Sequence, residues 1–282
     1  MAKRQHLLII DPQNDFCDLP QPWWGWDPLA DQAVAPALPV VGAHADMLRL
    51  AHWVDQGRSG LTDITVTLDS HHSLDIAHPT FWAQADGSAV APFTLITAQA
   101  LRSGRFQPKD ALAYERALAY LCALEAQGRY QLMVWPVHCA IGSWGHNVHA
   151  AVRAAYQQWE QQRQRVVQFV FKGSNPWTEH YSAIQAEVPD TQDPHTLLNL
   201  NLIANLDQAD TVFIAGEASS HCVRATTEHL VQHLPSGRTD KLVLLTDCMS
   251  AVAGFEPQAR DFLRQMQERG VRLASSEQLV LS

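Results

Sequence analysis

One cysteine stands at a position where chemistry is common in α/β proteins. Cys222 lies in the stretch GEASSHCVRAT, between the apolar run ADTVFIAG and a helical pattern. Reactive groups in open α/β sheets gather where a strand ends and a helix begins. The positive end of a helix dipole favours a thiolate there. Cys222 is therefore a candidate nucleophile, while a small buried core residue is an equally good reading of this position taken alone.

Other polar side chains follow other apolar runs. Parallel strands end along one edge of a sheet, so residues that follow them can meet although they are distant in the chain. Six side chains are candidates for this edge: Asp11, Asp69, His71, His138, Lys172 and Cys222. Their convergence depends only on the strand assignments.

These residue types suggest two kinds of chemistry. Asp11 could take the proton of the Cys222 thiol and return it to a leaving group. The ammonium of Lys172 would favour the thiolate. Asp69 and His71, in DSHH, together with a distant histidine form a suitable set of ligands for a divalent metal with positions left open.

Each residue also has an ordinary structural interpretation. Asp11 taken singly is more often a cap or turn residue than a base. Lys172 before Gly173 could be a solvated turn, and DSHH could be a polar loop. The functional reading is favoured because the ordinary one requires several independent coincidences at one edge of the sheet.

Short apolar runs alternate with amphipathic stretches along the chain. Apolar runs without alternation are typical of strands covered on both faces. The expected strands cover 6–10, 63–68, 130–135, 166–171, 210–216 and 241–246, and VRLASS adds a short closing strand. The expected helices cover 43–57, 110–127, 145–163, 195–206, 221–234 and 256–269. The pattern predicts an α/β fold with a mainly parallel sheet between two layers of helices.

We expect residues 1–282 to form a single domain with insertions near 18–40 and 85–128. Within the second insertion, the stretch of about 85–109 is expected to pass over the edge that holds the polar residues. The first is rich in Pro and Trp. Its tryptophans either pack the loop onto the domain or cover a pocket for a flat ligand.

The composition excludes some classes of partner. The 282 residues carry a formal net charge of −9, with acidic and basic residues mixed, which argues against nucleic acid and anionic membranes. No apolar run approaches the length of a membrane span. The five cysteines are widely spread without a CxxC motif, which favours a reduced, cytoplasmic protein. A homo-oligomer is compatible with this composition.

The chain resembles nicotinamidases of the isochorismatase-like cysteine hydrolase superfamily. The resemblance is carried by LLIIDPQNDFC, VTLDSHH, VWPVHCAIGSWGHNVH, FKGSNPWTEHYSA, AGEASSHCVRATTEHL and LTDCMSA, in that order. It implies an isochorismatase-like, Rossmann-like three-layer sandwich. It also implies a metal-containing amidohydrolase that converts a carboxamide to an acid and ammonia through a cysteine thioester.

The resemblance also implies roles for individual residues. It implies the catalytic triad Asp11, Lys172 and Cys222, and a metal site of Asp69, His71 and His138 for zinc, iron or manganese. It further implies an oxyanion hole of the Ala218 and Cys222 amides after a cis Glu217–Ala218 peptide, and substrate contacts from Phe16, Trp135 and Tyr181.

The sequence departs from the family pattern around the pocket. Glu217 replaces a usually apolar residue, SSH replaces the usual run before the nucleophile, and His72 and His78 are extra histidines near the metal ligands. Three alternatives therefore stay open. The first is a metal-dependent hydrolase in which water attacks. The second is a cysteine hydrolase of a larger amide, a carbamoyl compound or an isochorismate-like ether. The third is a binding or redox-sensing protein without catalysis.

Overall fold

A six-stranded parallel sheet forms the centre of the computed structural model, which describes residues 3–279 and 281. The strand order is β12-β11-β10-β1-β4-β9, and every neighbouring pair is parallel. Its strands are β1 (Gln5–Ile10), β4 (Asp63–Asp69), β9 (Gln168–Lys172), β10 (Thr211–Gly216), β11 (Leu242–Leu245) and β12 (Arg272–Ala274). The strand order confirms the predicted mainly parallel sheet.

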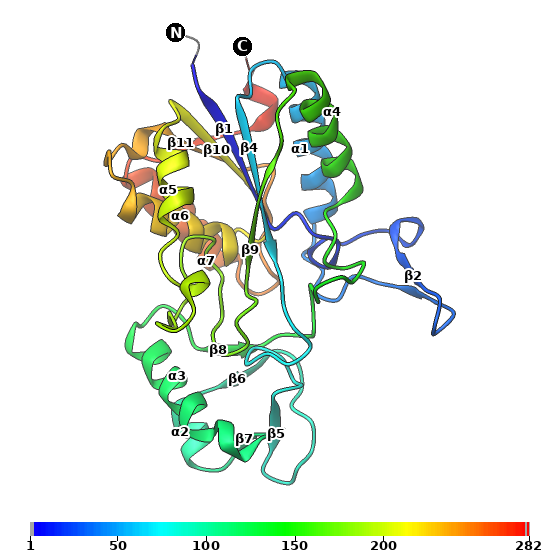
Figure 1. The fold of residues 1–282 in the computed structure, drawn as a ribbon, viewed down its shortest axis with the longest axis vertical. Helices are drawn as coiled ribbons and strands as arrows, with labels where there is room; N and C mark the ends of the chain where they lie inside the picture. Colours follow the sequence, from blue (N-terminus) through cyan, green and yellow to red (C-terminus); the bar gives the residue numbers. More distant parts are fainter. Residues whose placement is uncertain (1–2, 280, 282) are drawn as a thin grey trace.

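Helices cover both faces of this sheet (Figure 1). One face packs against α1 (Ala43–Gly57) and α4 (Ala150–Arg163). The other packs against α5 (Leu200–Asp207), α6 (Cys222–His233) and α7 (Glu256–Glu268). Successive residues of β1 alternate between the two cores, with Leu7 and Ile9 on one side and Leu8 and Ile10 on the other. Burial on both faces explains why the central strands are apolar throughout.

The second insertion lies beyond the carboxyl ends of the strands, at the bottom of Figure 1. It contains α2 (Ala98–Arg102) and α3 (Tyr114–Ala126), whose apolar faces join the core on the α6 side of the sheet. Two small antiparallel pairs flank these helices: β5 (Trp82–Gln84) with β7 (Phe106–Pro108), and β6 (Thr94–Ile96) with β8 (Leu132–Val134). As expected, this segment passes over the edge that holds the polar residues.

One predicted strand pairs with a different strand from the one expected. The run 130–135 was expected in the parallel sheet, but only β8 forms there, and it pairs antiparallel with β6. Leu132 and Val134 are buried against the insertion and not within the main sheet. A short apolar run shows that a segment is buried but not which strand it joins.

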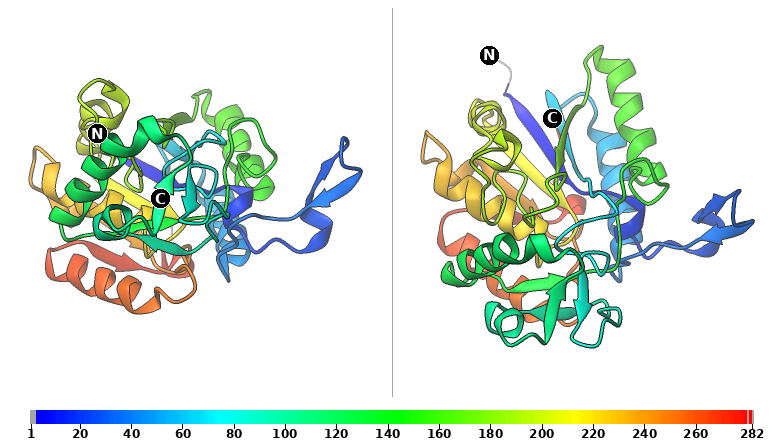
Figure 2. Two further views of the ribbon diagram at one scale, coloured as in Figure 1. Left: turned by 90° about the horizontal axis from the view of Figure 1, so that it is seen from below. Right: turned by 60° about the horizontal axis from the view of Figure 1, so that its bottom comes forward.

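The Pro- and Trp-rich insertion extends away from the sheet edge (Figure 2). Its tip is a hairpin of β2 (Gly25–Asp27) and β3 (Gln32–Val34). Trp23 stacks on His149 at 5.0 Å, the Trp24 indole donates to Leu19 O at 2.8 Å, and Trp26 is 61% exposed. Trp23 and Trp24 therefore contact neighbouring groups, whereas Trp26 faces solvent.

Candidate active site

The candidate nucleophile lies immediately beyond the end of β10. Gly216, the last residue of β10, has φ +118°, and a Cβ there would lie 1.9 Å from Ile10 O, so a side chain cannot be accommodated. The Glu217–Ala218 peptide that follows is cis, as the family resemblance implied. Cys222 is the first residue of α6 and is buried. The strand-to-helix junction expected from the sequence is therefore present.

The structure brings Asp11, Lys172 and Cys222 together. Lys172 Nζ lies 2.9 Å from Asp11 Oδ2 and 3.6 Å from Cys222 Sγ. Asp11 directly follows β1, Lys172 ends β9 and Cys222 begins α6, so three separate elements supply the group. Thr67 Oγ1 donates to Asp11 Oδ1 at 2.6 Å and orients that carboxylate. At most 6% of each of the three predicted residues is exposed.

Burial dominates the proton affinities of this group. It raises the pKa of the Cys222 thiol well above its usual value, and the nearby Lys172 opposes the rise only in part. Burial likewise raises the pKa of Asp11, again against the attraction of Lys172. Burial disfavours the charged form of Lys172, but Asp11 and Asp69 outweigh it and hold the lysine pKa high. Burial therefore opposes the thiolate that the helix dipole favours, whereas the nearby Lys172 favours it.

The three predicted metal ligands also meet. Asp69 Oδ2 lies 3.1 Å from His71 Nε2 and 3.4 Å from His138 Nε2. Ligand atoms held tetrahedrally at 2.0–2.1 Å from a zinc ion are separated by about 3.3 Å. This spacing and the mixed nitrogen and oxygen donors fit a divalent cation.

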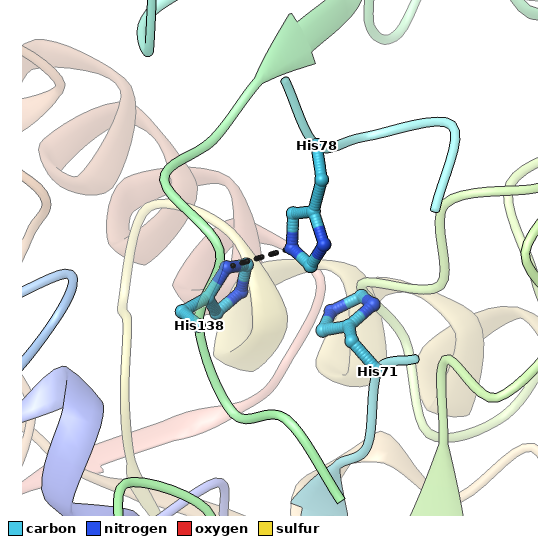
Figure 3. A group of neighbouring side chains, drawn as sticks. All are labelled: His71, His78 and His138. Atoms are coloured by element: carbon cyan, nitrogen blue, oxygen red, sulfur yellow. Dashed lines mark hydrogen bonds between the residues drawn. The ribbon is translucent and has the colours of Figure 1, made fainter. Parts of the chain in front are cut away.

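A fourth side chain, His78, belongs to the same cluster. His71, His78 and His138 face one another, and each offers a nitrogen within 4.8 Å of those of the other two (Figure 3). His78 is fully buried, whereas the alternative candidate His72 is exposed. Burial lowers the pKa of His78 to about 2, so its imidazole is neutral and able to bind a metal.

Backbone pairing explains how His138 reaches this cluster without a parallel strand before it. His71 N donates to Cys139 O at 3.1 Å, and Ile141 N donates to His71 O at 3.0 Å. This short bridge holds the two histidine-bearing segments side by side. The other ring nitrogen of His71 lies 3.0 Å from Asp75 Oδ2, which fixes the orientation of the ring.

A narrow cavity of about 30 Å³ lies against Cys222, His138 and Asp69, and we call it the catalytic pocket. The three predicted substrate residues, Phe16, Trp135 and Tyr181, all line it. Trp135 Nε1 donates to Tyr181 OH at 3.1 Å, which ties two of them together. Sequence reasoning did not assign four further lining residues: Leu38, Glu179, His221 and Val252.

Of these four residues, only Glu179 and His221 could have been found from a sequence motif. Glu179 and His221 stand inside motifs already singled out, two positions before Tyr181 and one position before Cys222 respectively. Leu38 and Val252 are apolar loop residues, which no pattern distinguishes from ordinary core. Leu38 reaches the wall because its N–H pairs with Asp15 O and that of Val40 with Phe16 O, folding the loop back.

Two amide groups beside Cys222 are available to a ligand. Ala218 and Cys222 are the predicted oxyanion donors, and both line the catalytic pocket. Within residues 3–279 and 281, neither amide N–H donates a hydrogen bond to the protein. Unpaired donors at a helix N-terminus favour a negatively charged oxygen.

The chain has the isochorismatase-like α/β fold. The structure is similar to that of the yeast nicotinamidase bound to the inhibitor nicotinaldehyde, with a TM-score of 0.62 and 18% identity over 96% of this chain and 99% of that one. A nicotinamidase/pyrazinamidase from Acinetobacter baumanii matches with a TM-score of 0.62 and 18% identity over 99% of both chains. The pyrazinamidase of Pyrococcus horikoshii in complex with zinc matches with a TM-score of 0.51 and 16% identity over 96% of this chain and 99% of that one.

Comparison of the sequence alone with protein-family models and with curated proteins found no match. The similarity is therefore one of fold. No helix among the described residues is long and apolar enough to cross a membrane.

Proposed function

We propose that this protein is a cysteine amidohydrolase that converts a small carboxamide to its acid and ammonia, with nicotinamide as the first substrate to test. The observation that carries the proposal is the group of Asp11, Lys172 and Cys222, with Lys172 Nζ at 2.9 Å from the carboxylate and 3.6 Å from the sulfur. The similarity of fold to nicotinamidases and pyrazinamidases supports the same conclusion.

The first half of the reaction forms a thioester. Cys222 Sγ attacks the carboxamide carbon while Asp11 takes the thiol proton. The carbonyl oxygen becomes negative and accepts hydrogen bonds from the amides of Ala218 and Cys222. Asp11 then gives its proton to the leaving nitrogen, the C–N bond breaks and ammonia departs.

The second half releases the acid. Asp11 takes a proton from a water molecule, which attacks the thioester carbon. The C–S bond breaks, and the Cys222 sulfur regains a proton. Lys172 stays charged throughout, because Asp11 and Asp69 hold it in an ion-pair network at 2.9 Å and 3.1 Å. It therefore limits the cost of moving negative charge between sulfur and carboxylate in a buried site.

Asp69, His71 and His138 would hold a divalent metal ion, zinc first, or iron or manganese, with His78 beside them. The chemistry supplied by such an ion is Lewis-acid binding of a ring nitrogen of the substrate, which positions the amide. Phe16 and Trp135 would contact the faces of a flat ring, and Tyr181 would close the pocket behind them.

The measurement that tests this proposal is ammonia release from nicotinamide by protein supplied with zinc. We expect turnover that falls by about 10³-fold or more in Cys222→Ala, as for removal of other catalytic nucleophiles. Cys122→Ala serves as the matched control, because Cys122 lies on α3, outside the catalytic pocket.

Other outcomes assign the protein to one of the three alternatives. Full activity in Cys222→Ala, lost with a chelator, would indicate attack by water at the metal. Turnover of other amides, carbamoyl compounds or ethers but not of nicotinamide would indicate the second alternative. Ligand binding without any turnover would indicate a binding protein.

A further inference from the structure

A second, larger cavity of about 530 Å³ adjoins the catalytic pocket, and we call it the outer cavity. Its wall includes Arg129, Tyr130, Arg224 and Phe255, from α6 and from the segments after α3 and before α7. Tyr181 and His221 line both cavities. The two spaces therefore share these two side chains in their walls.

The catalytic pocket is much smaller than the outer cavity. Its volume is about 30 Å³, against about 530 Å³ for the outer cavity. A substrate that is longer than the pocket must therefore extend past its wall. The outer cavity is the neighbouring space for such a substrate, because His221 and Tyr181 line both cavities.

Flat side chains surround His221, which lines both cavities. The His221 ring lies 6.4 Å from that of Tyr130 in a stacked arrangement and 4.7 Å from that of Phe255 in an edge contact. Burial lowers the pKa of His221 to about 4, so the ring is uncharged at neutral pH. A flat or apolar part of a ligand fits between such rings.

Arg224 is one of the polar residues that line the outer cavity, together with Arg129, Glu125 and Gln258. Its Nε donates to Glu228 Oε1 at 2.8 Å, which fixes the plane of the guanidinium. Glu228 also accepts from Arg129 Nη2 at 2.6 Å, and Glu187 lies 3.5 Å from Arg129, so both acids are engaged with Arg129. Across the described part of the chain, the two Nη atoms of Arg224 have no acceptor. A guanidinium held by Nε with both Nη groups free is arranged to bind a carboxylate or phosphate through two hydrogen bonds.

We propose that the outer cavity is a substrate subsite, and that the substrate is a carboxamide whose acyl part carries a flat or apolar spacer ending in an acidic group bound by Arg224. This inference rests on the proposed amidohydrolase function, and it adds the class of substrate. The amide end would lie at Cys222, the spacer would pass between His221 and Tyr130, and the carboxylate or phosphate would meet the Nη atoms.

The test uses benzamides that carry an alkyl chain of one to four methylenes ending in a carboxylate, a phosphate or an uncharged hydroxyl. Ammonia release gives kcat/KM for each. For the best chain length we expect the acidic compound to exceed its hydroxyl analogue by about 10- to 100-fold, the effect of one bidentate charged contact. The carboxylate and phosphate series identify which acid is preferred.

Variants assign the effect to Arg224. In Arg224→Ala the ratio between acidic and uncharged compounds should fall to about one, and Arg224→Lys, which keeps the charge without the fork, should give an intermediate ratio. Arg264→Ala, an exposed arginine of α7 paired with Glu268, should keep the wild-type ratio. A ratio near one in the wild type, or an unchanged ratio in Arg224→Ala, would overturn the inference while the amidohydrolase proposal stands.

A binding measurement separates the two proposals if no benzamide is hydrolysed. Calorimetry measures the binding of the acidic and hydroxyl compounds to two proteins. One is Cys222→Ser, and the other is the double variant Cys222→Ser with Arg224→Ala. Tighter binding of the acid that depends on Arg224 supports the subsite even though the proposed reaction has failed. Equal binding of the two compounds, or none, rules out the subsite.

Discussion

Glu217 is a buried acid that directly precedes Ala218, the proposed oxyanion donor. Its Oε2 accepts from Ser250 N at 3.0 Å, and Ser250 Oγ donates to Asp46 Oδ2 at 2.5 Å. Ser219 N in turn donates to Ser250 O at 2.8 Å. The Glu217 carboxyl group thus links the segment before Cys222 by hydrogen bonds to the loop that ends at Val252 in the pocket wall. An apolar residue, which the family pattern has here, could not make this contact.

The protonation of Glu217 has a consequence for stability. Burial raises its pKa well above the ordinary 4.5, and the neighbouring Asp46 raises it further. Asp18 and Cys17 also face this region, and Arg49 pairs with Asp46. The folded protein therefore binds a proton that the unfolded chain releases above pH 4.5, so this group favours folding less and less as the pH rises.

We expect Glu217→Gln to become more stable relative to the wild type as the pH rises from 5 to 8. The amide keeps a carbonyl acceptor for Ser250 N but has no proton to lose. The difference should grow by up to about 1.4 kcal/mol per pH unit, measured by urea unfolding at pH 5, 6.5 and 8. The exposed Glu277→Gln is the control. A difference that stays constant with pH would contradict the buried, protonated state.

The β2–β3 hairpin contributes no residue to the lining of the catalytic pocket. Residues 26–33 are exposed apart from Asp27, and the hairpin projects from the body of the molecule (Figure 2). The preceding turn differs, because Gly25 lies against Trp144, where a Cβ would come within 2.5 Å of the indole. The returning strand differs as well, since Leu38 lines the pocket.

Replacement of residues 26–33 by a short Gly/Ser linker should therefore leave kcat/KM for every amide within about 2-fold, and change the free energy of unfolding by less than about 0.5 kcal/mol. Leu38→Ala, in the same insertion, should lower kcat/KM because it removes part of the pocket wall. Amide hydrolysis and urea unfolding of both variants are the measurements. A changed ranking of substrates in the trimmed protein would show that the hairpin closes over the pocket.

At the scale of the whole molecule, buried histidines make the stability of the folded protein depend on pH in the acid range. Burial lowers the pKa values of His6, His149 and His221 to about 4. The unfolded chain binds protons at these positions from pH 6.5 downward, whereas the folded chain resists protonation until about pH 4. Their contribution to stability is present above pH 6.5 and is lost as the pH falls through this window.

His6 offers the simplest test of this coupling, because it lies in β1 far from the pocket and its Nε2 contacts Thr65 Oγ1 at 2.8 Å. His6→Gln can keep a hydrogen bond to Thr65 without titrating. Between pH 6.5 and 4.5 the wild type should lose up to about 1.4 kcal/mol per pH unit more than the variant. Urea unfolding measures both, with the exposed His52→Gln as the control. Parallel pH dependence of wild type and His6→Gln would show that His6 does not contribute.

Much of the fold could be predicted from the sequence, and so could the group of Asp11, Lys172 and Cys222. The helix predicted at 43–57 has the bounds of α1, and five of the six predicted strands lie in the parallel sheet. The reason is local: continuous apolar runs mark strands buried on both faces, and amphipathic periodicity marks helices. Asp11, Lys172 and Cys222 were then predictable, because strand ends in a parallel sheet share one edge whatever the distance between them in the chain.

Only the tertiary structure decided how the insertions complete the site. β8 joins β6, His78 enters the metal cluster, Leu38 returns to the pocket wall, and Arg224 faces a cavity shared with His221. These outcomes depend on contacts between loops distant in the chain, such as the backbone bridge from His71 to Cys139 and Ile141. Sequence periodicity reports which face of a segment is buried. It carries no information on which distant segment covers that face, because that choice depends on the packing of all of them together.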